Sequence, residues 1–192
     1  MAKVVAPLGS FSASGKIGKS LVFFSHLGRN VVRGLVTPAN PKTVTQGDTR
    51  LLLGALGRAC KAIVNPSDFY TDVKTVTPSG QTFVSYLIKN VINIYGSGQA
   101  GVAALQGEAD GHVASNLETQ AVVAGLSDLT INYAGTISTI TAGAQLLAIA
   151  KHAMNIKASN PALFARTPYT TALASWDSAD VVAFVADLST EA

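Results

Sequence analysis

The segment PANPKTVTQ, residues 38–46, constrains the fold most, because the hydrophobic pattern of the chain changes across it. Proline lacks an amide donor and forces the residue before it into an extended conformation. Neither a helix nor a central strand can therefore run through Pro38 and Pro41, and we expect a stiff hinge. This hinge ends an N-terminal arm, residues 1–44, and a body follows over residues 45–192.

Residues 15–37 have the pattern of a β-hairpin. Two β-prone runs flank the sequence HLGRN, whose Gly28 and Asn30 can adopt the positive φ of a tight turn. Residues 1–14 are small, apolar and interrupted by glycine and proline, which predicts an extended tail that a partner orders. An isolated hairpin is marginally stable in water, so we expect the arm to lie on the body or on another subunit.

Apolar residues at helical spacing dominate the rest of the chain. Helices are predicted over residues 45–64, 80–95, 141–156 and 178–188. Within residues 97–140 the sequence predicts only a short strand or hairpin, at 128–140. The expected fold class is α+β, mainly α, with an N-terminal β-hairpin arm followed by a small-residue-rich helical body.

Three details of the body give narrower expectations. Gly54 and Gly57 in the first predicted helix would permit a close contact with another helix. Asp177 or Ser178 is placed to cap the last helix. The large aromatic residues near the C-terminus are expected to cluster, either as a core or as interface anchors: Tyr169, Trp176 and Phe184.

Charge is scarce and unevenly divided. Only 13% of the residues are charged, against about 25% in an average soluble domain, so part of the surface is expected to face neighbouring subunits. Residues 1–64 carry nine Lys or Arg and one Asp, a net +8, while residues 65–192 carry five basic and ten acidic residues, a net −5.

The basic part has two possible partners, nucleic acid or the acidic part of the next subunit. The positive residues are spaced along the chain rather than clustered, and aromatic residues do not interleave with them in the sequence. This favours the acidic neighbour, and nucleic acid stays as the alternative.

Residues with catalytic or metal-binding chemistry form no complete motif. The single Cys60 lies in the first predicted helix, where packing is its expected role. Glu108 and Asp110 lack the further oxygen ligands of a calcium loop. The histidines have no second ligand at helical spacing: His26, His112 and His152.

Two glycine-rich segments superficially resemble nucleotide-binding loops. GKIGKS, residues 15–20, has two residues between its glycines where a P-loop has four, and a predicted strand follows it. GSGQAG, residues 96–101, follows a predicted helix rather than a strand and indicates a flexible helix-to-loop joint. We therefore expect no enzyme, no cofactor, no metal site and no catalytic residue.

Membrane insertion and secretion are also not expected. No apolar run reaches the roughly 18–20 residues of a membrane span. The first 14 residues have no apolar core of the kind that a secretory signal needs.

The segment Ser14–Arg50 resembles an N-terminal signature of poorly characterised phage and prophage proteins, some of them thought to be virion components. The pattern runs SGxIG, an aromatic strand, GxxVVR and PxNPKTxxQxxxR. It covers about a quarter of the chain, and no activity is attached to it. The resemblance implies a structural protein made in the host cytoplasm and built into a virion, with itself and other proteins of the particle as partners.

The unpaired edges of a hairpin can add to a neighbour's sheet. We therefore predict a non-enzymatic, self-assembling structural subunit, a head, connector or tail component whose arm and hinge contact neighbouring subunits. The alternatives are a nucleic-acid-associated protein that uses the basic residues of 1–64, and a non-viral filament subunit. The predicted interface residues are Phe11, Leu21, Phe23, Phe24, Arg29, Val31, Val32, Arg33, Pro38, Asn40, Pro41 and Arg50.

Overall fold

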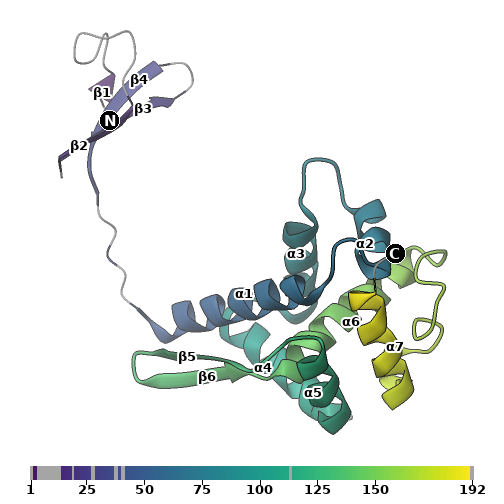
Figure 1. Ribbon diagram of the computed structural model, residues 1–192. Helices are drawn as coiled ribbons and strands as arrows, with labels where there is room; N and C mark the ends of the chain where they lie inside the picture. The colour runs from purple at the N-terminus through teal and green to yellow at the C-terminus, as the bar shows by residue number, and fades with distance from the viewer. Residues whose placement is uncertain are drawn as a thin grey trace. The chain divides into compact units, whose positions relative to one another are not determined.

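The computed structural model describes residues 2–3, 14–18, 20–26, 29–36, 39, 42–112 and 114–190 (Figure 1). The chain divides into two compact units, residues 1–41 and 42–192, which are called the arm and the body from here on. Helices make up 57% of the structure, and an antiparallel sheet precedes them. The predicted class, α+β and mainly α, is confirmed.

The arm is a four-stranded antiparallel sheet of order β1-β4-β3-β2, and the predicted hairpin forms its two central strands. β3 and β4 pair from Leu21↔Gly34 to His26↔Arg29. The expectation that a partner orders the tail is wrong for residues 2–3, which pair with β4 of their own arm. The strands are β1 Ala2–Lys3, β2 Gly15–Ile17, β3 Leu21–His26 and β4 Arg29–Gly34.

The described part of the body is helical apart from one two-stranded hairpin. Its elements are α1 (Val44–Ala62), α2 (Asp68–Val76), α3 (Phe83–Tyr95), α4 (Gly98–Gly111), α5 (Ala114–Val123), β5 (Leu129–Tyr133), β6 (Thr136–Ile140), α6 (Ala142–Ser159), the 3-10 helix η2 (Leu173–Ser175) and α7 (Ser178–Ser189). The sequence predicted α1, α3, α6, α7 and the hairpin, and it missed α2, α4 and α5. None of the helices that the structure describes is both long and apolar enough to cross a bilayer.

Side-chain caps fix where most of the helices begin. Thr43, Ser67, Thr82 and Thr141 each accept a hydrogen bond from a backbone amide in the first turn of α1, α2, α3 and α6. Asp177 caps α7 as predicted, with Oδ1 accepting from two amides. Each such cap stabilises its helix by about 1 kcal/mol.

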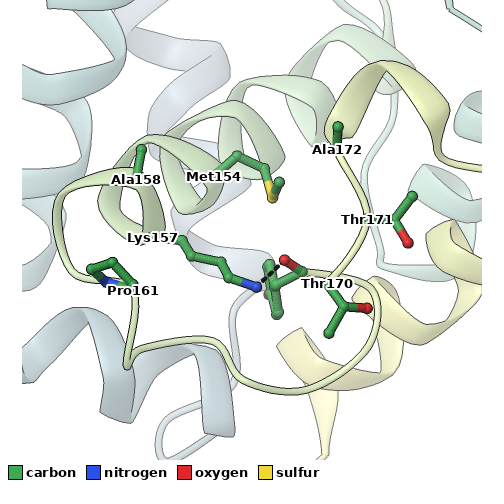
Figure 2. Close-up of a pocket in the computed structure, with 8 residues that line it drawn as sticks. Met154, Lys157, Ala158, Pro161, Thr170, Thr171 and Ala172 are labelled. Atoms are coloured by element: carbon green, nitrogen blue, oxygen red, sulfur yellow. Dashed lines mark hydrogen bonds between the residues drawn. The ribbon is translucent and has the colours of Figure 1, made fainter.

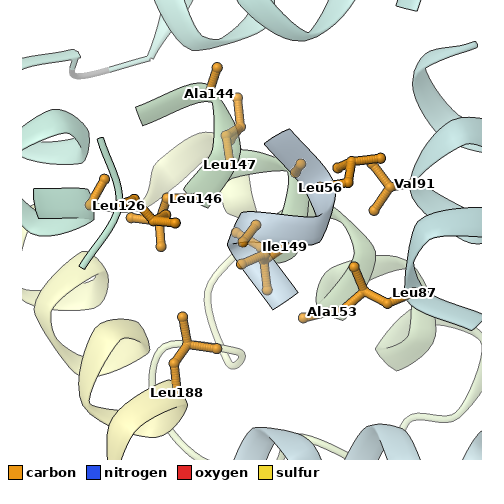
Figure 3. Packing of buried hydrophobic residues seen from close by; sticks show 14 of the residues in the cluster. Leu56, Leu87, Val91, Leu126, Ala144, Leu146, Leu147, Ile149, Ala153 and Leu188 are labelled. Carbon is orange, nitrogen blue, oxygen red and sulfur yellow. The ribbon is translucent and has the colours of Figure 1, made fainter. Parts of the chain in front are cut away.

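α6 is the central helix of the body and contacts α1, α3, α4 and α5. Its residues from Ala142 to Ala150 are all buried, and its many alanines let neighbouring helices approach closely. Leu56 of α1, Leu87 and Val91 of α3 and Leu188 of α7 lie around it (Figure 3). Because burying one such side chain stabilises by roughly 1.5–3 kcal/mol, this cluster dominates the stability of the body.

The β5–β6 hairpin packs along α1 through glycine (Figure 1). A Cβ at Gly47 would lie 2.7 Å from the Cβ of Tyr133, and one at Gly54 would lie 3.1 Å from a methyl of Leu129. The predicted helix contact through Gly54 and Gly57 is wrong. Gly54 faces a strand, and a Cβ at Gly57 would meet no described atom within 4 Å.

The loop between α6 and α7 is held by an aromatic cluster and an ion-pair network. Tyr169, Trp176 and Phe184 pack with ring centroids 5.3–6.3 Å apart and are buried, so the predicted cluster is confirmed as core. Arg166 donates to Asp187 of α7 at 2.9 Å and to Asp72 of α2 at 3.0 Å. The Tyr169 hydroxyl also donates to Asp187, at 2.8 Å.

Candidate functional site

The arm sheet has two faces of different chemistry. Side chains alternate between faces along a strand, and paired residues on neighbouring strands share a face. Leu21 and Phe23 of β3 therefore share a face with Ile17 of β2 and Val32 of β4, together with Ser25 and Asn30. We call these six residues the neutral face.

The residues in between form the charged face. Val22, Phe24 and His26 of β3 alternate with the neutral residues, and their partners across the sheet bring in the cations. The charged face consists of Lys16, Val22, Phe24, His26, Arg29, Val31 and Arg33. Arg29, Arg33 and Lys16 are all exposed, and no described basic side chain of the arm strands lies on the neutral face.

Ring contacts confirm this arrangement of the charged face. The guanidinium carbon of Arg33 lies 5.3 Å from the ring centre of Phe24, a cation–π distance. The ring of Phe24 meets that of His26 edge-on, with centroids 6.4 Å apart. Aromatic residues therefore do interleave with the basic ones, which the linear sequence did not reveal. The interleaving depends on which strand residues are paired, and only the sheet register supplies that.

Apolar residues of the arm remain partly exposed. Phe23 and Val32 on the neutral face are half-buried, and Ile17 and Leu21 are 43% and 40% exposed. Neither a helix nor a second sheet covers them among the described residues of the arm. β2 pairs only with Leu21–Phe23, so no described strand borders the outer edge of residues 24–26.

The predicted interface residues fall into three places. Leu21, Phe23 and Val32 lie on the neutral face, and Phe24, Arg29, Val31 and Arg33 lie on the charged face. Arg50 lies in α1 of the body, where its guanidinium carbon is 5.2 Å from the ring centre of Tyr133. Outside the described residues are Phe11, Pro38, Asn40 and Pro41.

The body has an open pocket of about 320 Å³ beside the C-terminal half of α6 (Figure 2). Met154, Lys157 and Ala158 line it from α6, and residues 161 and 169–172 line it from the following loop. Lys157 donates its ammonium hydrogen to the carbonyl oxygen of Tyr169. The lining contains no histidine and no carboxylate to act with this lysine as an acid–base pair.

Two reactive side chains of the body are enclosed by apolar residues. Burial raises the pKa of the Cys60 thiol to about 12, so the nucleophilic thiolate is absent at neutral pH. Burial lowers the pKa of His152 to about 4, and neither of its ring nitrogens has a hydrogen-bond partner among the described residues. The two neighbouring carboxylates of α4 have partners within the body. Glu108 forms an ion pair with Lys151 of α6 at 2.7 Å, and Asp110 accepts a hydrogen bond from Gln106.

Neither glycine-rich segment forms a nucleotide-binding loop. Residues 15–17 are strand β2, and another strand, not a helix, follows the turn at Gly18. At GSGQAG the expected loop is wrong, because α4 begins at Gly98. The corner between α3 and α4 is packed, since a Cβ at Gly101 would lie 2.5 Å from the carbonyl oxygen of Gly96.

Within the part of the chain that the structure describes, no group of three or more His, Cys, Asp or Glu side chains could hold a metal ion. No protein-family model, no curated protein and no solved structure matches the chain. The two faces of the arm sheet are therefore the candidate functional site.

Proposed function

We propose that this chain is a non-enzymatic structural subunit of a phage-type particle, and that it assembles by seating the neutral face of its arm on another copy of the chain. The observation that carries this proposal is the uncovered neutral face. A unit of 41 residues lies near the size below which a chain needs another molecule to fold stably.

The energetics favour an added layer on the neutral face. Ile17, Leu21, Phe23 and Val32 each keep part of their apolar surface in water. Covering them would contribute about 1 kcal/mol for each side chain, or about 4 kcal/mol for each arm. A particle multiplies this contribution by its number of subunits.

A second copy is the favoured occupant because the body also exposes apolar side chains. Val122 and Val123 at the end of α5 are 64% and 69% exposed, and Val182 of α7, which packs beside α5, is 49% exposed. Contacts of one copy's arm with the next copy's body are head-to-tail, and such contacts close into rings or continue as filaments. The phage assignment itself depends on the resemblance of Ser14–Arg50 to virion-type proteins.

The test compares the full chain with one double variant, which changes the neutral face, and one single variant, which changes an exposed valine outside that face. Phe23→Thr/Val32→Thr removes apolar surface from the neutral face but keeps residues that favour strands. Val36→Thr is the matched control, because Val36 is exposed and follows β4. Light scattering after size exclusion and negative-stain electron microscopy measure the assembly.

We expect particles or rings from the full chain and from Val36→Thr, and monomers from Phe23→Thr/Val32→Thr. Deletion of residues 1–41 should leave a folded body that no longer assembles. A full chain that stays monomeric at high concentration contradicts the proposal, and so does an arm-deleted chain that forms the same particles. Unlimited filaments without closed particles would favour the non-viral alternative.

A further inference from the structure

We propose that the charged face of the arm binds the phosphate backbone of a nucleic acid. This inference concerns the opposite side of the sheet from the one proposed for assembly. It would let one arm contact protein and nucleic acid at the same time.

The charged face has the composition of a polyanion-binding surface. Lys16 and Arg33 flank Val22 in one row across the sheet, and Arg29 lies two pairs further along β4. With strands about 4.8 Å apart and a rise of about 3.3 Å per residue, these cations lie roughly 10–16 Å from one another. Such a spacing distributes positive charge along an extended ligand instead of concentrating it on one small anion.

The rings of the same face add a second kind of contact. Phe24 lies in the row between Arg33 and Arg29, and His26 meets its edge. Arg33 already stacks on Phe24. Cations that follow a backbone, next to rings on which bases can stack, are the combination found in surfaces that bind single strands.

The partner that the sequence pattern favoured, an acidic surface of a second body, is weakly supported by the charges of the body. The arm has five Lys or Arg and no Asp or Glu, a net +5, whereas the body has nine basic and eleven acidic residues, a net −2. A body so close to neutrality offers little field to attract the arm.

The acidic side chains of the body are also engaged within it. Of the ten that the structure describes, nine accept a hydrogen bond or form an ion pair with the body itself. They are Asp48, Asp68, Asp72, Glu108, Asp110, Asp128, Asp177, Asp180 and Asp187. The excess positive charge of the arm therefore calls for a polyanion from outside the chain.

The experiment measures binding of the full chain to a fluorescent 40-nucleotide single strand and to a 40-base-pair duplex between 50 and 200 mM salt. Three phosphate contacts predict a slope of log affinity against log salt of about −2 for the single strand, so affinity should fall about twenty-fold over this range. Arg29→Gln/Arg33→Gln should reduce the slope to about −0.7. Arg29→Lys/Arg33→Lys keeps both positive charges, so this variant should keep the salt slope of the parent chain.

Matched controls separate this inference from the assembly proposal. Lys74→Gln/Lys89→Gln removes two exposed cations from the body and should leave both affinity and slope unchanged. Phe23→Thr/Val32→Thr should abolish assembly yet keep the salt slope. A chain that binds nucleic acid without assembling, or assembles without binding, therefore shows which of the two proposals fails.

The two nucleic acids identify the contact. Tighter binding of the single strand, weakened by Phe24→Leu, indicates stacking on the ring in addition to phosphate contacts. Equal binding of both forms indicates phosphate contacts alone, and either result supports the charged face. Unchanged binding by Arg29→Gln/Arg33→Gln overturns the inference, as does tighter binding of polyglutamate than of either nucleic acid.

Discussion

The arm and the body differ in how much of their apolar and charged surface is covered or paired within the unit itself. The body encloses α6 with four helices, and nearly all of its described acidic groups have partners within it. The arm has no covering layer among its described residues, and its exposed cations gather on one face. The packing of the body is thus largely complete within itself, whereas both faces of the arm sheet lack a covering layer, and our proposals assign them to other molecules. Variants that disturb one unit should leave the other largely unaffected.

The largest difference should come from truncating one apolar side chain to alanine in each unit. Leu147→Ala in α6 removes a fully buried side chain, so the free energy of unfolding of the body should fall by about 3–4 kcal/mol. Val32→Ala removes a half-buried side chain of the arm and should change the free energy of unfolding of the body by less than about 0.5 kcal/mol. Chemical denaturation followed by the fluorescence of Trp176 measures both. A Leu147→Ala protein as stable as the parent would mean that α6 is not the centre of the body.

Acid should destabilise the body through His152. Because burial lowers its folded-state pKa to about 4, its neutral form is stable in the fold, and unfolding takes up a proton below the ordinary pKa of 6.5. Stability should be complete above pH 6.5 and fall as the pH drops toward 4, by about 3 kcal/mol at most. The arm has no Asp or Glu side chain.

Denaturant midpoints at pH 7, 5.5 and 4.5 measure this dependence. His152→Leu should remove the part of the pH dependence that is due to this residue. His112→Gln is the matched substitution at a partly exposed histidine, which follows α4. An identical pH profile for His152→Leu and the parent would show that His152 is not the group that protonates.

The smallest of the three effects should come from the internal ion pairs of the body. Asp187→Asn weakens two contacts, with Arg166 and Tyr169, around a side chain that is only 6% exposed. Since Arg166 is partly solvated, we expect a loss of about 2 kcal/mol rather than the 3–5 kcal/mol of a fully buried pair. Asp110→Asn, at an exposed residue, should cost less than about 0.5 kcal/mol, and equal losses would contradict the distinction.

Periodicity predicted the elements whose apolar residues form a clear pattern. β3, β4, α3 and α6 were placed within about three residues of where they begin and end. Hydrophobic periodicity did not predict α4 and α5, because their buried positions are mostly small residues. In α4 these are Gly98, Gly101 and Ala109 around a single Leu105, which leaves no apolar stripe to detect. α2 has only nine residues, and its signal was the cap at Ser67.

The candidate site was only half predictable for a different reason. The sequence led us to predict Phe23, Phe24, Arg29 and Arg33 as interface residues but did not separate them by face. Alternation along β3 alone divides Phe23 from Phe24. Placing Arg29 and Arg33 beside Phe24 needs the pairing His26↔Arg29 and Val22↔Arg33, which depends on the turn and not on composition.

The register of the arm sheet also limits how such a chain can change in evolution. Exchanging one cation for another, or one apolar residue for another, preserves the alternation and should be tolerated. Losing or gaining a single residue within β3 would move every following side chain to the other face and mix charge with apolar surface. Length changes of two residues would not. In related arms we therefore expect residue identities to vary within each face. Their strands should differ in length only by even numbers of residues.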